Sequence, residues 1–598
     1  MSAPIKTNQL TYTFDKELFS KNYDIFCIRT LEKHFKNGAY IIDAPLLSNN
    51  VCSVLFKSGR EIFVLMKSND SNKSLLKNAI LKEDGADRIT ISQVTPNSLK
   101  DDIVFQLMLN SLGNYESPLL KFNNLTGHLY CFHPNWLIRG RKSEADVVFK
   151  VPCLELRLSS EFRLNMEVHT FTSELLRNKI EFKKKKFDEY PKYIFSAHNT
   201  LRRKLKDDVG YSFIMRQTKN AKTEIAFLDI QNIDRFNQSK MGILTTVLEN
   251  FNDRFLSIAH LDFESITDYK ALDYTRSVAN ENKQAISDLL SIKPIKIVDC
   301  IDDEYSKIFC KEICDLLLSK YGIKTSCGKR VAKDHLNIRV IHNAAFYADS
   351  DDPHRVFNDV AVQHITFEDF SECSEFAIST VIHEMLIKAD LVKQKISLFD
   401  WNTLGLKDDI DFGIEVTDEQ NTKYIFMTIH TDGTFDISEQ TLNLFEANKY
   451  NQCVEIFENA KMNSEKVHGI IRDALGNINI IKDTGWFTIP EIYSIKAELA
   501  NGNTKLRGKE KRNELLSSCL DIKMFNDGVS GYYFVGTIGN GMRWLINRAA
   551  NIRKIEPFED SILMFEKLLP LMNVTFVHNG QLTIIPFPFK YLREHLNK

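Results

Sequence analysis

The sequence predicts a multidomain α/β protein. Its 598 residues exceed what one compact core holds, because globular domains usually span about 100–200 residues. The composition, 43% hydrophobic and 26% charged, is that of an ordinary globular chain. From residue 295 to 405, short apolar runs alternate with helical patterns, which is typical of a doubly wound parallel sheet.

Charge and cysteine usage narrow the class of protein. The formal net charge is −2, so any nucleic-acid-binding surface has to be a local basic patch. The eleven cysteines show no zinc-binding spacing, and their odd number favours reduced thiols and a cytoplasmic protein. We expect no membrane span, because no window approaches about 18 apolar residues.

Changes of pattern along the chain divide it into six predicted segments. Strand patterns dominate the first two, a basic stretch and long amphipathic helices follow, and the last two combine strands with helices. The segments are 1–105, 106–175, 176–235, 236–294, 295–405 and 406–598.

Two basic stretches are candidate contacts for a nucleic-acid backbone. Residues 181–206 carry nine basic against three acidic side chains, and 501–513 carry five against one. Each is either a solvated surface or a phosphate contact, and the aromatics within 181–206 suit either base stacking or a core. The candidate backbone contacts are Lys183, Lys184, Lys185, Lys186, Arg202, Arg203, Lys505, Arg507, Lys509 and Arg512.

Two acidic residues stand on predicted strands of the last segment. Glu415 lies within DFGIEVT, and Asp473 ends HGIIRD. A nuclease that uses two metal ions needs several converging carboxylates, because both the attacking and the leaving oxygens are charge-compensated. The sequence offers no clear third or fourth carboxylate.

These motifs resemble those of Argonaute proteins, in particular prokaryotic Argonautes. The strand pair IEVT and YIFMTIHTDGTF is similar to the opening hairpin of the PIWI domain, whose G-x-D-V motif supplies a catalytic aspartate. HGIIRDALGN resembles the strand of that domain that ends in R-D-G. Gln363 and Lys388 stand 25 residues apart, as do the glutamine and lysine of the MID domain, which holds the 5′ end of a guide strand.

The resemblance implies an Argonaute-like bilobal architecture with a Rossmann-like MID domain at 295–405 and an RNase H-like PIWI domain at 406–598. It makes 1–105 the N-terminal domain, 106–175 linker 1, 176–235 a reduced or absent PAZ region, and 236–294 linker 2. The residues implied at the guide 5′ end are Gln363, Lys388, Arg355, His354 and Tyr347. An Mg²⁺ ion at the guide 5′ end is a further candidate.

The chain departs from the resemblance at the catalytic positions. Glu415 replaces the first aspartate, and Asn573 falls about where the last histidine or aspartate would lie. A neutral amide is a poor replacement for a catalytic metal ligand. We therefore expect degenerate catalytic positions at Glu415, Asp473 and Asn573, no catalytic metal, and no cofactor required for chemistry.

The resemblance implies guide-dependent binding of target nucleic acid, in prokaryotic defence against plasmids or phage. The expected partners are a short guide RNA or DNA, a complementary target DNA and a separately encoded effector such as a nuclease or helicase. Two alternatives stay open. One is an active Mg²⁺-dependent, RNase H-like guided endonuclease, and the other is a non-catalytic scaffold for protein interactions.

Overall fold

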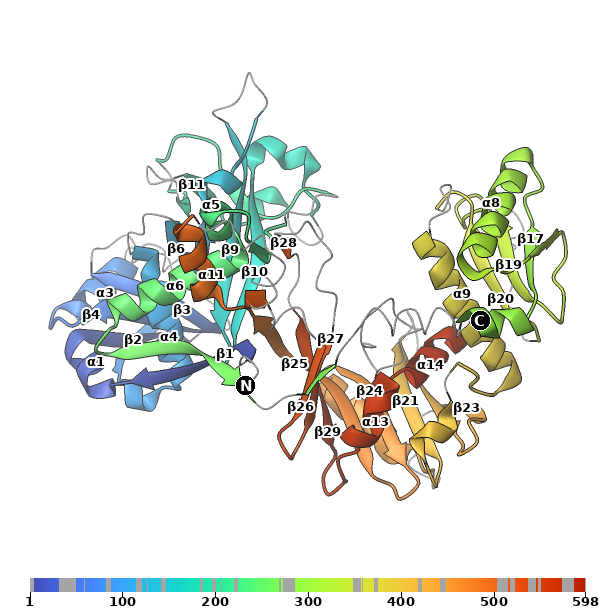
Figure 1. The fold of residues 1–598 in the computed structure, drawn as a ribbon. Coiled ribbons are helices and arrows are strands. Elements are labelled where there is room, and N and C mark those ends of the chain that lie inside the picture. Colours follow the sequence, from blue (N-terminus) through green and yellow to red (C-terminus); the bar gives the residue numbers. More distant parts are fainter. Residues whose placement is uncertain are drawn as a thin grey trace. The chain divides into compact units, whose positions relative to one another are not determined.

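A computed structural model of the chain falls into two compact units. The first holds 1–267, 486–520 and 537–550, and the second holds 268–485, 521–536 and 551–598 (Figure 1). The structure describes residues 5–31, 50–58, 60–81, 88–114, 121–125, 127–140, 147–182, 186–195, 201–205, 207–219, 224–267, 270–272, 286–347, 357, 359–369, 375–398, 400–417, 422–440, 448–502, 515–516, 522–535, 545–546, 550–572 and 586–596.

This division differs from the boundary predicted at residue 406. Residues 486–520 and 537–550 fall within the predicted last domain, yet they pack with the first unit. The mixed α/β, multidomain character expected from the sequence is present, and the six finer segments stay predictions. Within the described residues, no helix is long and apolar enough to cross a membrane.

The first unit contains two sheets. The strands of the smaller one are, in spatial order, β3 (Val51–Ser58), β4 (Glu61–Lys67), β2 (Tyr23–Thr30) and β5 (Ile89–Val94). The larger sheet is ordered β12 (Leu201–Arg203), β11 (Tyr193–Phe195), β13 (Phe213–Met215), β10 (Leu164–Ser173), β9 (Val148–Leu158), β7 (His128–Phe132) and β6 (Lys121–Leu125), with β8 (Ile138–Arg139) beside β9. The period-two patterns expected in both regions thus form strands.

Helices and two further strand pairs complete the first unit. Its core joins α4 to α6 and α11 through apolar side chains that are almost fully buried. The helices are α1 (Lys16–Asn22), α3 (Asn72–Leu81), α4 (Asp101–Asn110), α5 (Ile233–Asn237), α6 (Lys240–Arg254) and α11 (Ile492–Ala500). The strand pairs are β1 (Ile5–Phe14) with β15 (Ala259–Ile266), and β14 (Leu228–Asp229) with β28 (Leu545–Ile546).

The expected long helix after residue 236 ends earlier than predicted. Helix α6 stops at Arg254, and the residues from Ala259 on form β15 instead. In that strand Ala259, Leu261 and Phe263 are buried while the residues between them are exposed. This alternation has a period of two, which fits a half-buried strand and not a helix.

The second unit begins with a parallel sheet. Its order is β18 (Ser326–Gly328), β17 (Ile295–Asp299), β19 (Leu336–Ile341) and β20 (Val362–Thr366), and all neighbouring strands are parallel. Helix α8 (Glu304–Tyr321) follows β17, and α9 (Glu375–Lys393) follows β20. The parallel sheet expected from residue 295 is therefore present.

An antiparallel sheet forms the rest of the second unit. Its order is β16 (Lys270–Leu272), β26 (Ile522–Asn526), β27 (Gly531–Val535), β29 (Asn551–Pro557), β25 (Ile478–Ile489), β24 (Val467–Asp473), β21 (Ile410–Thr417), β22 (Thr422–Ile429) and β23 (Phe435–Gln440). Its helices are α10 (Asn451–Met462), α13 (Phe565–Met572) and α14 (Pro588–Leu596). One apolar core includes side chains of this sheet, of α14 and of the parallel sheet.

Helix α14 packs on the antiparallel sheet at a strand glycine. A Cβ atom added at Gly469 in β24 would lie 2.5 Å from the ring of Phe589, which is fully buried in α14. Because packing fixes both the ring and the sheet, neither can move aside without a loss of stability.

We predict that Gly469→Ala lowers the free energy of unfolding by about 1–3 kcal/mol, since overpacking a filled core costs this much. Thermal and urea unfolding measure the effect. Gly328→Ala is the matched strand control, because its added Cβ meets only the flexible Lys296 side chain. Equal stability of Gly469→Ala and wild type would show that α14 does not pack there.

Candidate functional site

The candidate site of the second unit is formed by β20, α9 and α14. Gln363 is the second residue of β20, and its Nε2 donates a hydrogen bond of 2.7 Å to Oε2 of Glu384 on α9. Lys388 stands one turn further along α9, on the same face as Glu384. The structure thus brings together the strand glutamine and the helix lysine predicted from their spacing, around a glutamate that the sequence analysis missed.

Glu594 of α14 completes this group, and burial works against the charged forms of two of its members. Burial lowers the pKa of Lys388, and the nearby carboxylates of Glu594 and Glu384 oppose this shift. Burial, and then the charge of Glu384, raises the pKa of Glu594. The charges of Lys388 and Lys590 oppose this shift of Glu594, so two carboxylates and two ammonium groups lie near one another.

Two atoms of the group are open to a ligand. Oε1 of Gln363 is buried, and it has no hydrogen-bond partner among the described residues. Lys388 makes no ion pair within the described part of the chain, although two carboxylates are near. Buried polar atoms are normally satisfied, so the amide oxygen of Gln363 points to a molecule that binds here, beside the ammonium group of Lys388.

Tyr347 lies in the loop after β19, where its hydroxyl accepts a hydrogen bond of 3.2 Å from the backbone N–H of His342. The structure gives it no contact with Gln363 or Lys388. His354 and Arg355, which were predicted beside it, lie outside the described residues, as does Asn573.

The two predicted catalytic positions that are described, Glu415 and Asp473, do not converge. Strands β21 and β24 are antiparallel, with Ile410 opposite Asp473, so Glu415 lies five residues further along, or about 17 Å at the usual rise. Residues directly opposite share a face and successive residues alternate, so the two carboxylates also point to opposite faces. They cannot hold a common pair of metal ions.

Each of these carboxylates has local partners instead. Glu415 accepts a hydrogen bond of 3.3 Å from Thr417, and it lies 3.8 Å from Lys461 of α10. Asp473 accepts hydrogen bonds from the backbone N–H and the side-chain amide of Asn477, at 2.9 and 2.8 Å. These bonds close the turn between β24 and β25.

Several residues of the basic stretch 181–206 are buried or form ion pairs within the protein. Arg202 forms a two-pronged ion pair with Asp208 at 2.6 and 2.7 Å, and Arg203 is half-buried in β12. Phe187 and Tyr193 are buried in cores, so stacking on bases is not their role here. Lys186 is exposed. The remaining predicted contacts, Lys183, Lys184, Lys185, Lys505, Arg507, Lys509 and Arg512, lie outside the described residues.

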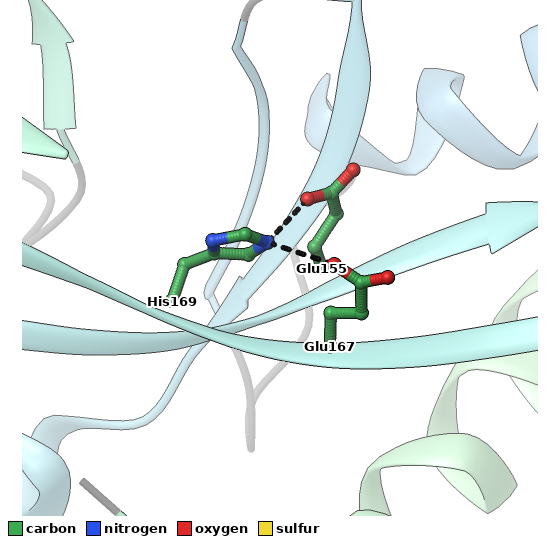
Figure 2. Close-up of side chains that lie close together, drawn as sticks. All are labelled: Glu155, Glu167 and His169. Atoms are coloured by element: carbon green, nitrogen blue, oxygen red, sulfur yellow. Dashed lines mark ion pairs between the residues drawn. The ribbon is translucent and has the colours of Figure 1, made fainter. Parts of the chain in front are cut away.

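The larger sheet of the first unit carries a separate cluster, which the sequence analysis did not single out. Glu155 on β9 is directly opposite Glu167 on β10, and His169 lies between them (Figure 2). Nε2 of His169 is 2.6 Å from Glu155 and 3.6 Å from Glu167, and Nδ1 of His128 on β7 is 2.7 Å from Glu155. The side chain of Glu155 is only 7% exposed.

Electrostatics indicates that this cluster is an ion-pair network. Burial alone would raise the pKa of Glu155, but His128 and His169 outweigh burial and lower it to about 2. The Glu155 carboxylate raises the pKa of His169. Although the ligand atoms of Glu155, Glu167 and His169 lie within 4.8 Å of one another, a metal ion would have to displace the proton that Glu155 helps to hold on His169.

Comparisons with known proteins add one structural likeness. No protein-family model matches the chain, and no curated protein matches its sequence. Among solved structures, the crystal structure of Drosophila Piwi is similar, with a TM-score of 0.40, 11% sequence identity, and coverage of 99% of this chain and 96% of that chain. This TM-score is too low to establish a shared fold, so the proposals below rest on this chain's own residues.

The Glu155 network predicts a pH-dependent effect of Glu155→Gln. Because the fold lowers the pKa of Glu155, this residue stabilises the fold at pH values above 4.5, its ordinary pKa. Because the fold raises the pKa of His169, this residue stabilises the fold at pH values below 6.5, its ordinary pKa. Removing one member of a buried pair costs about 3–5 kcal/mol. We expect the largest loss of stability near about pH 5.5 and a smaller loss near about pH 9, where His169 is neutral.

Thermal unfolding across pH measures this difference. Glu167→Gln is the control, because its side chain is 63% exposed and it should have little effect at either pH. A loss of stability in Glu155→Gln that is the same at both pH values would contradict the ion-pair assignment.

Proposed function

We propose that this protein binds a short guide strand by its 5′ end and pairs it with a complementary target nucleic acid. The observation that carries the proposal is the group formed by Gln363, Glu384, Lys388 and Glu594. Among the described residues, its buried amide oxygen has no hydrogen-bond partner and its ammonium group has no ion pair. The sequence resemblance to Argonaute motifs supports the same function.

The charges of the site bear on which 5′ end it accepts. The ammonium groups of Lys388 and Lys590 are balanced by the carboxylates of Glu384 and Glu594, so a bare phosphate would meet no net positive charge. Either a 5′-hydroxyl end binds, or a divalent cation offsets the charge of a phosphate. The oxygens of Glu384, Glu594 and Gln363 are the type of ligand that Mg²⁺ prefers, so these residues would hold such an ion.

The proposed protein is a binding platform and not a nuclease. The separation of Glu415 from Asp473 supports this, because metal-assisted cleavage needs carboxylates that converge. Following the sequence resemblance, we place the function in prokaryotic defence against plasmids or phage. Cleavage or unwinding of the target would be the task of a separately encoded effector, such as a nuclease or helicase.

Lys388→Ala tests the guide-binding site. The ammonium group should contribute a charge-assisted bond to a 5′-phosphate, worth about 1.5–3 kcal/mol. We therefore expect this variant to bind a 5′-phosphorylated guide about 10- to 100-fold more weakly in the presence of Mg²⁺, with a smaller loss for a 5′-hydroxyl guide. Fluorescence anisotropy with matched oligonucleotides measures both affinities.

Two controls accompany this measurement. Lys311→Ala removes an exposed lysine of α8 and should leave both affinities unchanged. Glu384→Gln removes one of the two opposing carboxylates, so it should reduce the dependence of phosphate binding on Mg²⁺. Equal losses of Lys388→Ala for both guides would reject phosphate recognition by Lys388.

The basic stretch at 181–206 gives a separate prediction about the nucleic-acid backbone. Reversing the charge of Lys184 and Lys185 should weaken guide–target binding about uniformly across sequences. The slope of log affinity against log salt should also become shallower, by roughly 0.7–0.9 for each phosphate that the variant no longer neutralises. Lys307→Glu with Lys311→Glu is the matched double reversal on α8. An unchanged slope in the Lys184 and Lys185 variant would make this stretch a solvated surface.

A further inference from the structure

A cavity of about 300 Å³ opens at the edge of the parallel sheet where its strands begin. Its lining comes from the residues just before β17, β19 and β20 and from the last turn of α9. On α9 the lining residues are Ala389, Val392 and Lys393, and none of Gln363, Glu384, Lys388 and Glu594 lines the cavity. The cavity is thus separate from the guide-binding group.

Two buried polar atoms that belong to residues of the lining have no hydrogen-bond partner among the described residues. They are Nζ of Lys293 and Nδ1 of His335. The carboxylate that acts on Lys293 is that of Asp390, but Asp390 is already bonded to the backbone N–H of Ser397 and the hydroxyl of Tyr591, each at 2.7 Å. Within the described part of the chain, the ammonium group of Lys293 therefore has no counter-ion in hydrogen-bonding contact.

The charges around the cavity favour an anion. Lys393 repels Lys293, and burial lowers the pKa of Lys293. Lys333 and Lys393 are exposed, as are the acidic residues of the lining, Asp334 and Asp359, so these four charges about balance and Lys293 remains as the buried positive charge. An anion at the buried end would relieve the repulsion and satisfy Lys293 and His335 together.

Size and wall chemistry define the class of ligand. A volume of about 300 Å³ is at the lower end of small-molecule sites. Leu336, Val360 and Ala361 give the cavity an apolar wall beside its basic end. We propose that this cavity binds a phosphate monoester, with the phosphate on Lys293 and His335. The ligand is a free small molecule, so the inference goes beyond the proposed binding of a guide.

Isothermal titration of the full chain with inorganic phosphate and with adenosine 5′-monophosphate tests the proposal. Lys293→Met removes the buried charge at nearly constant volume, and we expect it to weaken phosphate binding about 10- to 100-fold. Lys311→Met on α8 is the matched control and should bind as wild type does. Lys388→Ala should keep the phosphate binding that Lys293→Met removes, which separates this site from the guide-binding group.

A second measurement, the melting temperature, tests whether Lys293 has only a structural role. Because an unpaired buried charge destabilises a fold, Lys293→Met should melt at the same temperature as the free wild type or higher. Phosphate should raise the melting temperature of the wild type only. Tighter binding of adenosine monophosphate than of phosphate is expected for a monoester site, and tighter binding of inorganic phosphate would contradict a monoester ligand. Undiminished phosphate binding by Lys293→Met, or acetate binding as tight as phosphate, would overturn the proposal.

Discussion

The second unit depends on the hydrogen bond between Tyr591 of α14 and the buried carboxyl group of Asp390 on α9. Both residues are completely buried, and burial raises the pKa of each. A polar pair in this position is costly unless it is satisfied, so the bond fixes the C-terminal helix at one place on α9. The same helix packs Phe589 on Gly469 of the antiparallel sheet, and it thereby joins the two sheets in one core.

The position of α14 also determines the charge of the candidate site. Glu594 lies one turn beyond Lys590 on this helix, and it reaches the Lys388 group only because Tyr591 holds α14 against α9. The last turns of the chain thus supply one of the two carboxylates that oppose Lys388. The proposed recognition of a 5′ end would consequently be a property of the assembled unit and not of the parallel sheet alone.

Some of these features could be predicted from the sequence, and others could not, for physical reasons. Apolar strand runs separated by helical patterns identified the parallel sheet. Gln363 and Lys388, which the resemblance implies, both lie next to Glu384, and their role in binding stays a prediction. Glu384 could have been predicted from the sequence, because it precedes Lys388 by one turn on the same face of α9. The direction of β24 could not be predicted, because a period-two pattern is the same whichever way the strand runs. That direction is what separates Asp473 from Glu415. Aromatic residues such as Phe187 were equally ambiguous, since stacking on bases and packing in a core need the same side chains.

The central claim is that this protein carries a short guide strand, and the nucleic acid that accompanies it tests the claim most directly. The protein would be purified at low salt from cells of its host, and the bound nucleic acid would be extracted, end-labelled, sized and sequenced. The account predicts a narrow band of short strands with one type of 5′ end, and nuclease digestion of that band would identify it as RNA or DNA. Protein that retains no short nucleic acid under these conditions would contradict the account and favour a scaffold for protein interactions.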